Sequence, residues 1–414
     1  MAAVIEDVTA RRLFNSRGEE TLEVDVVTVA GFGRASAPAG ASRGKAEVTS
    51  YPEGKIGLAM TRVEELIAPE LIGRNADEQE EIDTLLHEID GTDDFSSLGG
   101  NTAYAVSLAI AEAAASSHGI PLFQHLAGYL VDELPYPLGN VLGGGRHAEG
   151  SAPDIQEFLI LPIGADSFLE AATVNTLIHQ KVGSLLRQRQ TGFPGGKGDE
   201  GAWAPNLADM DALEIVQKAC EGVTNESGVE CRLGLDLAAS TMWQQKTRCY
   251  RYNRSKVKRD PAEQLAFVLN LVESFNLAYV EDPFHEDDYE SFSNLTGKVT
   301  DCLVSGDDLF VTNKKRLARG VAANAGNAVV IKANQVGTLS DAWETTKLAR
   351  RSRYTPIISH RSGETTGPQL AHLSVAFQCP IIKTGVVGGS RVAKINELIR
   401  IEEMLGDRSK MAAL

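Results

Sequence analysis

The sequence predicts an α/β protein in which a smaller α+β part precedes a barrel of alternating strands and helices. Three observations support this. The chain has 414 residues, which suits one large domain plus a smaller one. Its first part mixes strand-like and helix-like patterns. From about residue 230 onward, short apolar runs end in polar residues 23 to 45 residues apart, and most steps are near the length of one strand plus one helix.

The composition excludes several classes of protein. Hydrophobic residues make up 43% and charged residues 23%, as in ordinary soluble proteins, and no apolar run is long enough to span a bilayer. The net charge of −16 argues against nucleic acid as a main partner, because phosphate backbones require clustered basic residues. The start of the chain has no apolar signal core, and the five cysteines are irregularly spaced. We therefore expect a cytoplasmic protein in a reducing compartment, with no integral membrane association.

Residues 1–130 are predicted to form the α+β domain. Residues 21–31 alternate apolar and polar side chains and end in glycine, which is typical of a half-buried strand, and residues 4–13 are a plausible partner. Helical spacing of apolar residues follows in three segments, and the third is rich in small residues, so it should pack closely on a neighbour. These segments are 61–73, 76–91 and 101–119.

Residues 131–414 are predicted to form the barrel. A sheet of apolar strands separated by helices is parallel and buried on both faces. An open doubly wound sheet would place its ligand at one crevice, usually beside a glycine-rich phosphate loop, and no such motif follows a first strand. A closed barrel instead gathers the residues at the C-terminal strand ends around one mouth. The polar residues in that position are Asp236, Glu281, Asp307, Lys332, His360 and Lys383.

Three of these strand-end residues, Asp236, Glu281 and Asp307, are acids. Carboxylates that converge at one barrel mouth repel one another unless a cation lies between them. Hard oxygen ligands favour Mg²⁺ over zinc or copper. The alternative is that each acid only caps the helix that follows it. Three acids in succession at the strand–helix period favour the metal site.

The two strand-end lysines, Lys332 and Lys383, each follow a buried apolar run. A partly desolvated lysine near bound cations has a lowered pKa and can act as a base. The alternative is that each lysine pairs with one of the acids. Further candidates lie in loops and turns between the strands: His147, Gln156, Glu157, Glu200, Arg361 and Ser362. Among them, Arg361 and Ser362 are adjacent hydrogen-bond donors suited to a phosphate group.

Several phrases of the chain, in order and at matching spacing, resemble the enolase family. They are SRGEETLEVDV, APAGASRG, QEF, GKGDEG, LGLD, EDPFHEDD, GDDLFVTN, IKANQVGTLSDA, SHRSGETT and IKTG, and they extend from about residue 5 to about residue 406. The resemblance implies a C-terminal (β/α)8-type barrel of the enolase kind. It also implies the interconversion of 2-phosphoglycerate and phosphoenolpyruvate, a hydro-lyase reaction of glycolysis and gluconeogenesis. Truncated tails and GVVGG-like stretches are typical of a microbial, archaeal-type branch.

The resemblance also implies a role for each candidate. Asp236, Glu281 and Asp307 match the ligands of a first Mg²⁺, and Ser42 matches a ligand of a second Mg²⁺ that binds with substrate. Lys332 matches the base, Glu200 the acid that assists loss of the hydroxyl group, and Glu157 its partner. His147, Gln156, His360, Arg361, Ser362 and Lys383 match positions that hold the substrate, and Lys383 also stabilises the developing charge.

The chain departs from the common family pattern around Ser42, where Arg43 replaces the usual threonine and residues 48–54 replace an acid-rich stretch. Family members are usually dimers and sometimes octamers, so we expect a homo-oligomer.

Two other functions remain open. One is a superfamily dehydratase acting on an acid sugar without phosphate, and the other is a catalytically weakened enolase-fold protein with a binding or structural role.

Overall fold

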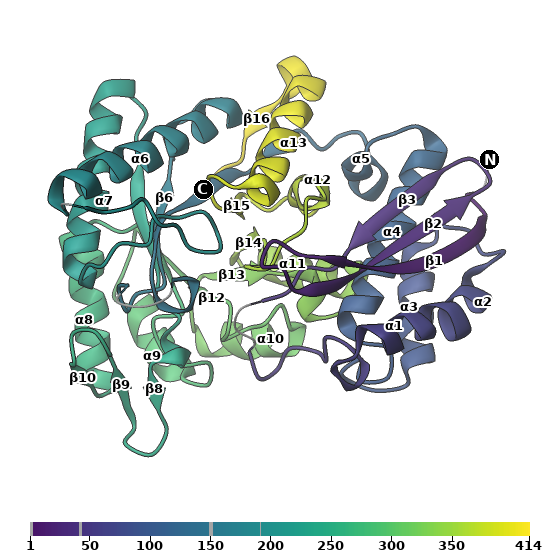
Figure 1. Ribbon diagram of the computed structural model, residues 1–414, viewed down its shortest axis with the longest axis horizontal. Coiled ribbons are helices and arrows are strands. Elements are labelled where there is room, and N and C mark those ends of the chain that lie inside the picture. Colours follow the sequence, from purple (N-terminus) through teal and green to yellow (C-terminus); the bar gives the residue numbers. More distant parts are fainter. Residues whose placement is uncertain (1–2, 41–43, 149–151, 191) are drawn as a thin grey trace.

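The fold was analysed in a computed structural model that describes residues 3–40, 44–148, 152–190 and 192–414. A three-stranded antiparallel sheet and a group of helices form the N-terminal part, and a closed eight-stranded barrel with its outer helices forms the rest (Figure 1). Ser42, predicted as a metal ligand, lies outside the described residues, as does Arg43. Among the described residues, no helix combines the length and the apolar character needed to cross a membrane.

The N-terminal sheet has the strand order β1-β2-β3. The strand predicted over 21–31 and its predicted partner are confirmed as β2 and β1, and β3 is an addition. The bounds are β1 Ile5–Phe14, β2 Glu20–Thr28 and β3 Phe32–Ser36. The three predicted helices are confirmed: the first as α1 with its continuations η2 and α2, the second as α3 and the third as α4. A short helix, α5, follows them. The bounds are α1 Ile56–Arg62, η2 Val63–Ile67, α2 Ala68–Leu71, α3 Gln79–Asp90, α4 Gly100–His118 and α5 Leu122–Ala127.

Helix α4 packs directly on the N-terminal sheet, as its small residues predict. A Cβ atom at Gly33 of β3 would lie only 1.9 Å from the Ala109 carbonyl oxygen of α4. Only glycine therefore allows this approach of strand and helix. The close packing fixes the sheet, whose strand β1 leads into the turn at residues 15–20 beside the barrel mouth.

The barrel closes in the order β11-β12-β13-β14-β15-β5-β6-β7. Its strands are β5 Tyr136–Gly143, β6 Glu157–Leu161, β7 Arg232–Asp236, β11 Tyr279–Glu281, β12 Leu303–Gly306, β13 Ala328–Ile331, β14 Thr355–Ser359 and β15 Ile381–Lys383. The parallel pairing predicted from about residue 230 is confirmed in β7 and β11 to β15. Strand β6 differs, because it runs antiparallel to both β5 and β7.

Eight longer helices follow the barrel strands: α6 Phe168–Arg189, α7 Asp209–Ser227, α8 Pro261–Ser274, α9 Tyr289–Thr296, α10 Lys314–Ala323, α11 Leu339–Arg351, α12 Gln369–Ala376 and α13 Gly389–Leu405. The 45-residue step between Asp236 and Glu281 is long because it also contains the small sheet β8 Trp243–Gln244, β9 Cys249–Arg251 and β10 Lys258–Arg259. Strands β4 Glu133–Leu134 and β16 Lys410–Met411 pair near the C-terminus.

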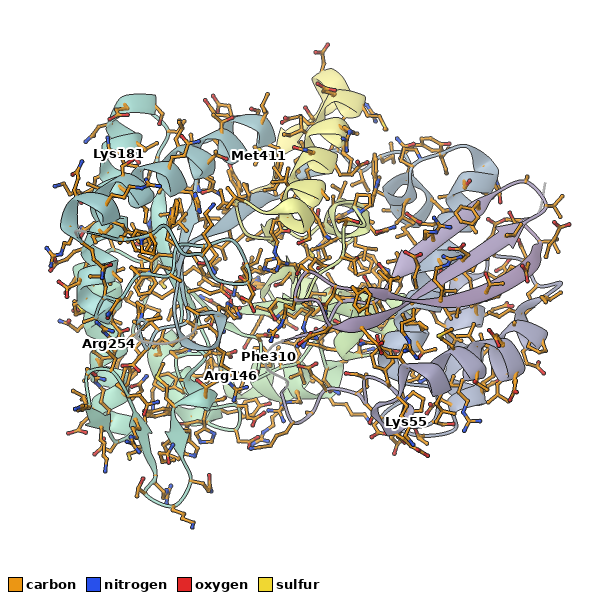
Figure 2. All side chains as sticks on the ribbon, viewed as in Figure 1. Lys55, Arg146, Lys181, Arg254, Phe310 and Met411 are labelled. Carbon is orange, nitrogen blue, oxygen red and sulfur yellow. The ribbon has the colours of Figure 1, made fainter. Side chains whose placement is uncertain are left out.

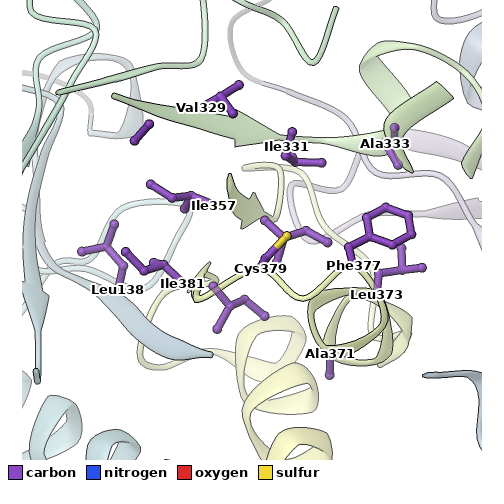
Figure 3. Close-up of a cluster of buried hydrophobic side chains, with 14 of the residues drawn as sticks. Leu138, Val329, Ile331, Ala333, Ile357, Ala371, Leu373, Phe377, Cys379 and Ile381 are labelled. Atoms are coloured by element: carbon purple, nitrogen blue, oxygen red, sulfur yellow. The ribbon is translucent and has the colours of Figure 1, made fainter. Parts of the chain in front are cut away.

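Apolar side chains fill both the barrel interior and the space between its strands and the outer helices. Leu138, Val329, Ile357 and Ile381 come from four barrel strands and are fully buried. They belong to the same apolar cluster as Phe377, which follows α12 (Figure 3). Side chains also occupy the region where the barrel meets the N-terminal part (Figure 2). This packing holds the strand ends in place, and the functional residues stand on those ends.

Candidate active site

The six polar residues predicted at strand ends all lie at one mouth of the barrel. Three are the last residues of their strands, and three directly follow a strand. The first group is Asp236, Glu281 and Lys383, and the second is Asp307, Lys332 and His360. Most of these six residues line one cavity of about 30 Å³, together with several of the predicted loop residues. The complete lining is Gly40, His147, Gln156, Glu157, Glu200, Asp236, Asp307, Lys332, Ser359, His360, Arg361, Ser362 and Lys383.

Lys383 is the central cation of this mouth. Its Nζ atom lies 2.7 Å from Glu281 Oε2, 3.0 Å from Asp236 Oδ2 and 3.3 Å from Glu157 Oε2. Burial would lower the pKa of this lysine, but the three carboxylates hold it well above its usual range. Lys383 is therefore an ammonium group at neutral pH, suited to stabilise negative charge and unsuited to remove a proton.

Glu281 lies deepest among the strand-end acids. Burial and the nearby Asp236 carboxylate raise its pKa to about 7. The Tyr279 hydroxyl donates a hydrogen bond to Glu281 Oε2, the oxygen that also contacts Lys383. A buried carboxylate needs this compensation, because desolvation strongly disfavours its charged form.

Lys332 and Asp307 form a direct ion pair. Asp307 also accepts a hydrogen bond from Gln335 Nε2 at 2.9 Å. Burial would lower the pKa of Lys332, but the Asp307 carboxylate outweighs it and raises that pKa above its usual value. The lowered pKa expected from the sequence refers to a lysine near bound cations and stays a prediction, whereas in the described protein Lys332 pairs with Asp307.

A cluster of acids that could hold a metal ion is present at this mouth. Each of Glu281, Asp282 and Asp307 offers a carboxylate oxygen, and these atoms lie within 4.8 Å of one another. Asp282 was missed by the sequence reasoning, although it directly follows the strand-end glutamate. It accepts hydrogen bonds from the backbone N–H groups of Asp307 and Asp308 and has a left-handed φ of 41°. Asp282 thus also holds the loop that carries Asp307.

The donor chemistry of the mouth fits a hard divalent cation. The acids that converge there, Asp236 included, present carboxylate oxygens with no thiol among them. Asp236 shares the contact with Lys383 that Glu281 makes, and it also accepts a 3.4 Å hydrogen bond from Gln156 Nε2. The ammonium groups of Lys332 and Lys383 balance the charge of these carboxylates in the described protein.

A second group of titratable residues faces the acids across the cavity. His147 Nδ1 lies 3.4 Å from Glu157 Oε1 and 3.7 Å from Glu200 Oε2, and all three side chains are buried. Asn140 of β5, which the sequence reasoning missed, donates a 3.1 Å hydrogen bond to Glu200 Oε2. Its position inside a fully buried strand carries no motif that would have marked it.

The two glutamates of this group differ in their protonation. Burial, followed by repulsion from Glu200, raises the pKa of Glu157 well above its usual value. Burial also acts to raise the pKa of Glu200, but His147 and His360 outweigh it and hold that pKa low. The opposite shifts favour the protonated form of Glu157 and the ionised form of Glu200.

Arg361 and Ser362 lie together directly after β14, as predicted. Arg361 Nη2 donates to both carboxylate oxygens of Glu47, at 3.2 and 3.0 Å, and Nη1 donates to Asn334 Oδ1 at 3.1 Å. Neither residue was predicted as part of the site: Asn334 lies in the family phrase IKANQVGTLSDA without an assigned role, and Glu47 lies in none of the family phrases. One nitrogen of the guanidinium thus contacts both oxygens of an internal carboxylate, a kind of acceptor that resembles a phosphate.

Four buried polar atoms of the cavity make no hydrogen bond within the described chain, although three of them lie 3.3 or 3.4 Å from a titratable side chain. They are Nδ1 of His147, Oε1 of Gln156, Oε2 of Glu157 and Nε2 of His360. Leaving such a group unpaired costs about 1–3 kcal/mol, so their gathering around one cavity is typical of a binding site completed by a polar ligand.

Residues 131–413 match the family described as the enolase C-terminal TIM barrel domain, and residues 5–126 match the enolase N-terminal domain. The chain belongs to the enolase family. It is 52% identical to an enolase of Methanosphaera stadtmanae over 98% of each chain and 52% identical to one of Methanothermobacter thermautotrophicus over the whole of both. An enolase of Archaeoglobus fulgidus is 46% identical over 99% of this chain. These relatives are archaeal, as the resemblance implied, and membership of the enolase family confirms the predicted (β/α)8-type barrel with a smaller α+β part.

Proposed function

We propose that this protein is a phosphopyruvate hydratase that interconverts 2-phosphoglycerate and phosphoenolpyruvate. The observation that carries the proposal is the single cavity lined by Lys332, Lys383, the glutamate pair and Arg361. Those groups supply a base, a charge stabiliser, an acid and a phosphate clamp within one small space. The relatives named enolase over the full length support the same reaction.

We propose Mg²⁺ as the cofactor, with Asp236, Glu281 and Asp307 as the residues that would hold a first ion. The convergence of buried carboxylates supports this assignment. A second ion that binds with substrate, with Ser42 as one ligand, rests on the family resemblance alone. When bound, Mg²⁺ supplies positive charge that stabilises the negative charge developing on the substrate carboxylate.

Lys332 is the proposed base for the proton on the carbon beside the substrate carboxylate. Its ion pair with Asp307 must loosen first, because only the neutral amine can accept a proton. Removal of that proton leaves extra negative charge on the carboxylate. Lys383, held as an ammonium by Asp236, Glu157 and Glu281, is placed to stabilise it.

The glutamate pair is the proposed acid. The hydroxyl group on the third carbon leaves as water after receiving a proton from this pair, with Glu200 as the acid that assists its loss and Glu157 as its partner, and a carbon–carbon double bond forms between the second and third carbons. Arg361 and Ser362 bind the phosphate, with the guanidinium exchanging Glu47 for the substrate. His147, Gln156 and His360, each with a buried polar atom that makes no hydrogen bond within the described chain, hold the remaining polar groups.

The remaining features of the proposal rest on the family resemblance. We propose a boundary between the two domains at residues 130 and 131, a homodimer or octamer, and a cytoplasmic, glycolytic role. Size-exclusion chromatography with light scattering would establish the oligomeric state.

The proposed reaction is tested by turnover of 2-phosphoglycerate with Mg²⁺, followed by the ultraviolet absorbance of phosphoenolpyruvate. We expect absorbance to rise, EDTA to stop it and added Mg²⁺ to restore it. Glycerate without phosphate serves as the matched substrate, because it lacks only the group that Arg361 is proposed to bind. Absence of turnover with 2-phosphoglycerate, or equal turnover of glycerate, would overturn the proposal.

A further inference from the structure

Arg391 is a buried cation at the rear of the active site, on the first turn of α13. It is 1% exposed, although arginine is among the largest side chains. Gly385, directly beyond β15, leaves room for it, since a Cβ there would lie 3.3 Å from Arg391 Cγ. No role in the proposed reaction has been assigned to this residue, and burying a guanidinium is costly unless its donors are used.

The donors of Arg391 are aimed at the segment that follows β14. Nη1 lies 2.9 Å from His360 Nδ1 and donates to the Arg361 carbonyl oxygen at 2.7 Å. Nη2 donates to the Ser362 carbonyl oxygen at 2.5 Å and to the Asp199 carbonyl oxygen at 3.3 Å. One guanidinium therefore joins the histidine, both residues of the phosphate clamp and the loop that carries Glu200.

The contact with His360 determines which ring nitrogen carries the proton. Arginine remains protonated in proteins, and its guanidinium has donors but no acceptor. His360 Nδ1 must therefore accept the hydrogen bond, and in the neutral ring the proton is left on Nε2. That atom lies 3.3 Å from Glu200 Oε1. Burial and the charge of Arg391 also lower the pKa of His360 to about 4, which keeps the ring neutral.

We propose that Arg391 is a positioning residue that fixes His360 in the Nε2–H tautomer and holds the backbone of the phosphate clamp. The Nε2–H group is thereby directed at Glu200, and Arg361 and Ser362 keep their places against the phosphate. The catalytic part of this inference rests on the proposed hydratase function, whereas the tautomer is a property of the protein without substrate.

The test is a long-range ¹H–¹⁵N NMR spectrum of protein labelled with ¹⁵N-histidine, with a His360→Gln variant to assign the signal. Wild-type protein is expected to show His360 as a single Nε2–H tautomer. The Nδ1–H tautomer, or a mixture of both, would overturn the proposal. This readout needs no turnover, so it separates failure of this inference from failure of the proposed function.

Two variants on α13 extend the test. Arg391→Met removes the donors, and we expect a mixture of His360 tautomers with a loss of about 10²-fold in kcat/KM that includes a raised KM.

Lys394→Met is the matched control, because Lys394 is equally buried on the same helix but donates to the Thr365 carbonyl oxygen instead. It should retain the wild-type tautomer. If Arg391→Met does not fold, Arg391→Gln, whose amide offers an acceptor as well as donors, should give the same change. An unchanged Nε2–H tautomer in a folded Arg391 variant would overturn the proposal.

Discussion

Glu157 and Asp236 are register partners across β6 and β7, although Glu157 begins its strand and Asp236 ends its own. The antiparallel direction of β6 explains this, because it brings the N-terminal end of one strand to the C-terminal end of the next. Both carboxylates consequently lie within 3.3 Å of the same ammonium group, that of Lys383. The glutamate pair and the acids proposed to bind a metal ion thus share one lysine, Lys383.

Lys383→Met should destabilise the metal-free protein by about 3–5 kcal/mol, because three buried carboxylates lose their cation. Urea unfolding in EDTA measures the change. Lys181→Met is the control, since Lys181 forms a half-exposed pair with Glu226 on the outer helices and should change stability by less than about 1 kcal/mol. Equal unfolding midpoints for Lys383→Met and the wild type would contradict the assigned role.

Glu200→Gln should keep solvent exchange of the α-proton, but the rate of dehydration should fall by about 10²- to 10⁴-fold. The amide preserves the hydrogen bond from Asn140 but cannot take part in proton transfer with Glu157. Exchange followed by NMR and product formation followed by absorbance are compared in the same sample. Loss of both steps together would contradict the separation of base and acid.

Arg361→Lys should raise the KM for 2-phosphoglycerate by about tenfold or more, because a lysine cannot make the two-point contact of a guanidinium. The inhibition constant for inorganic phosphate should weaken in parallel. Arg34→Lys is a matched control, since Arg34 binds Asp25 by the same two-point contact, but on the N-terminal sheet. An unchanged KM in Arg361→Lys would remove Arg361 from the phosphate clamp.

Asp209 at the start of α7 should make stability pH-dependent. Burial raises its pKa to about 6, from an ordinary value near 3.8. Between these two values the folded protein binds more protons than the unfolded chain, so this residue lowers stability as pH rises. Asp209→Asn retains an acceptor for the Ile155 N–H group, and its advantage over the wild type should grow by roughly 2 kcal/mol from pH 4 to 6.

The pH dependence of Asp209 is measured by urea unfolding at several pH values between 4 and 7. Asp211→Asn provides the comparison, because Asp211 stands in the same helical turn with a side chain that is 40% exposed. A constant difference between Asp209→Asn and the wild type across this range would contradict the raised pKa.

The strand ends were predictable from the sequence because a buried parallel strand has a simple signature. An apolar run followed by a charged residue, repeated at the period of a strand and a helix, located Asp236, Lys332 and Lys383 without any family knowledge. Periodicity could not find Glu157, because β6 is antiparallel and its functional residue precedes the apolar run.

The contacts that orient these residues were not predictable from the sequence. Glu47 and Arg361 are 314 residues apart, and Asn140 is 60 residues from Glu200. Only the closure of the barrel and the docking of the N-terminal part bring such pairs together. The ion pair of Lys332 with Asp307 joins residues from two strand ends in the same way.

The most direct test of the account is the exchange of the α-proton of 2-phosphoglycerate with D₂O in Lys332→Ala, measured by ¹H NMR with Mg²⁺ present. Lys347→Ala, which changes a lysine on α11 paired with Glu344, is the control. If Lys332 is the base, exchange should fall by at least about 10²-fold in Lys332→Ala and remain normal in the control. Exchange at the wild-type rate in Lys332→Ala would show that another group removes the proton.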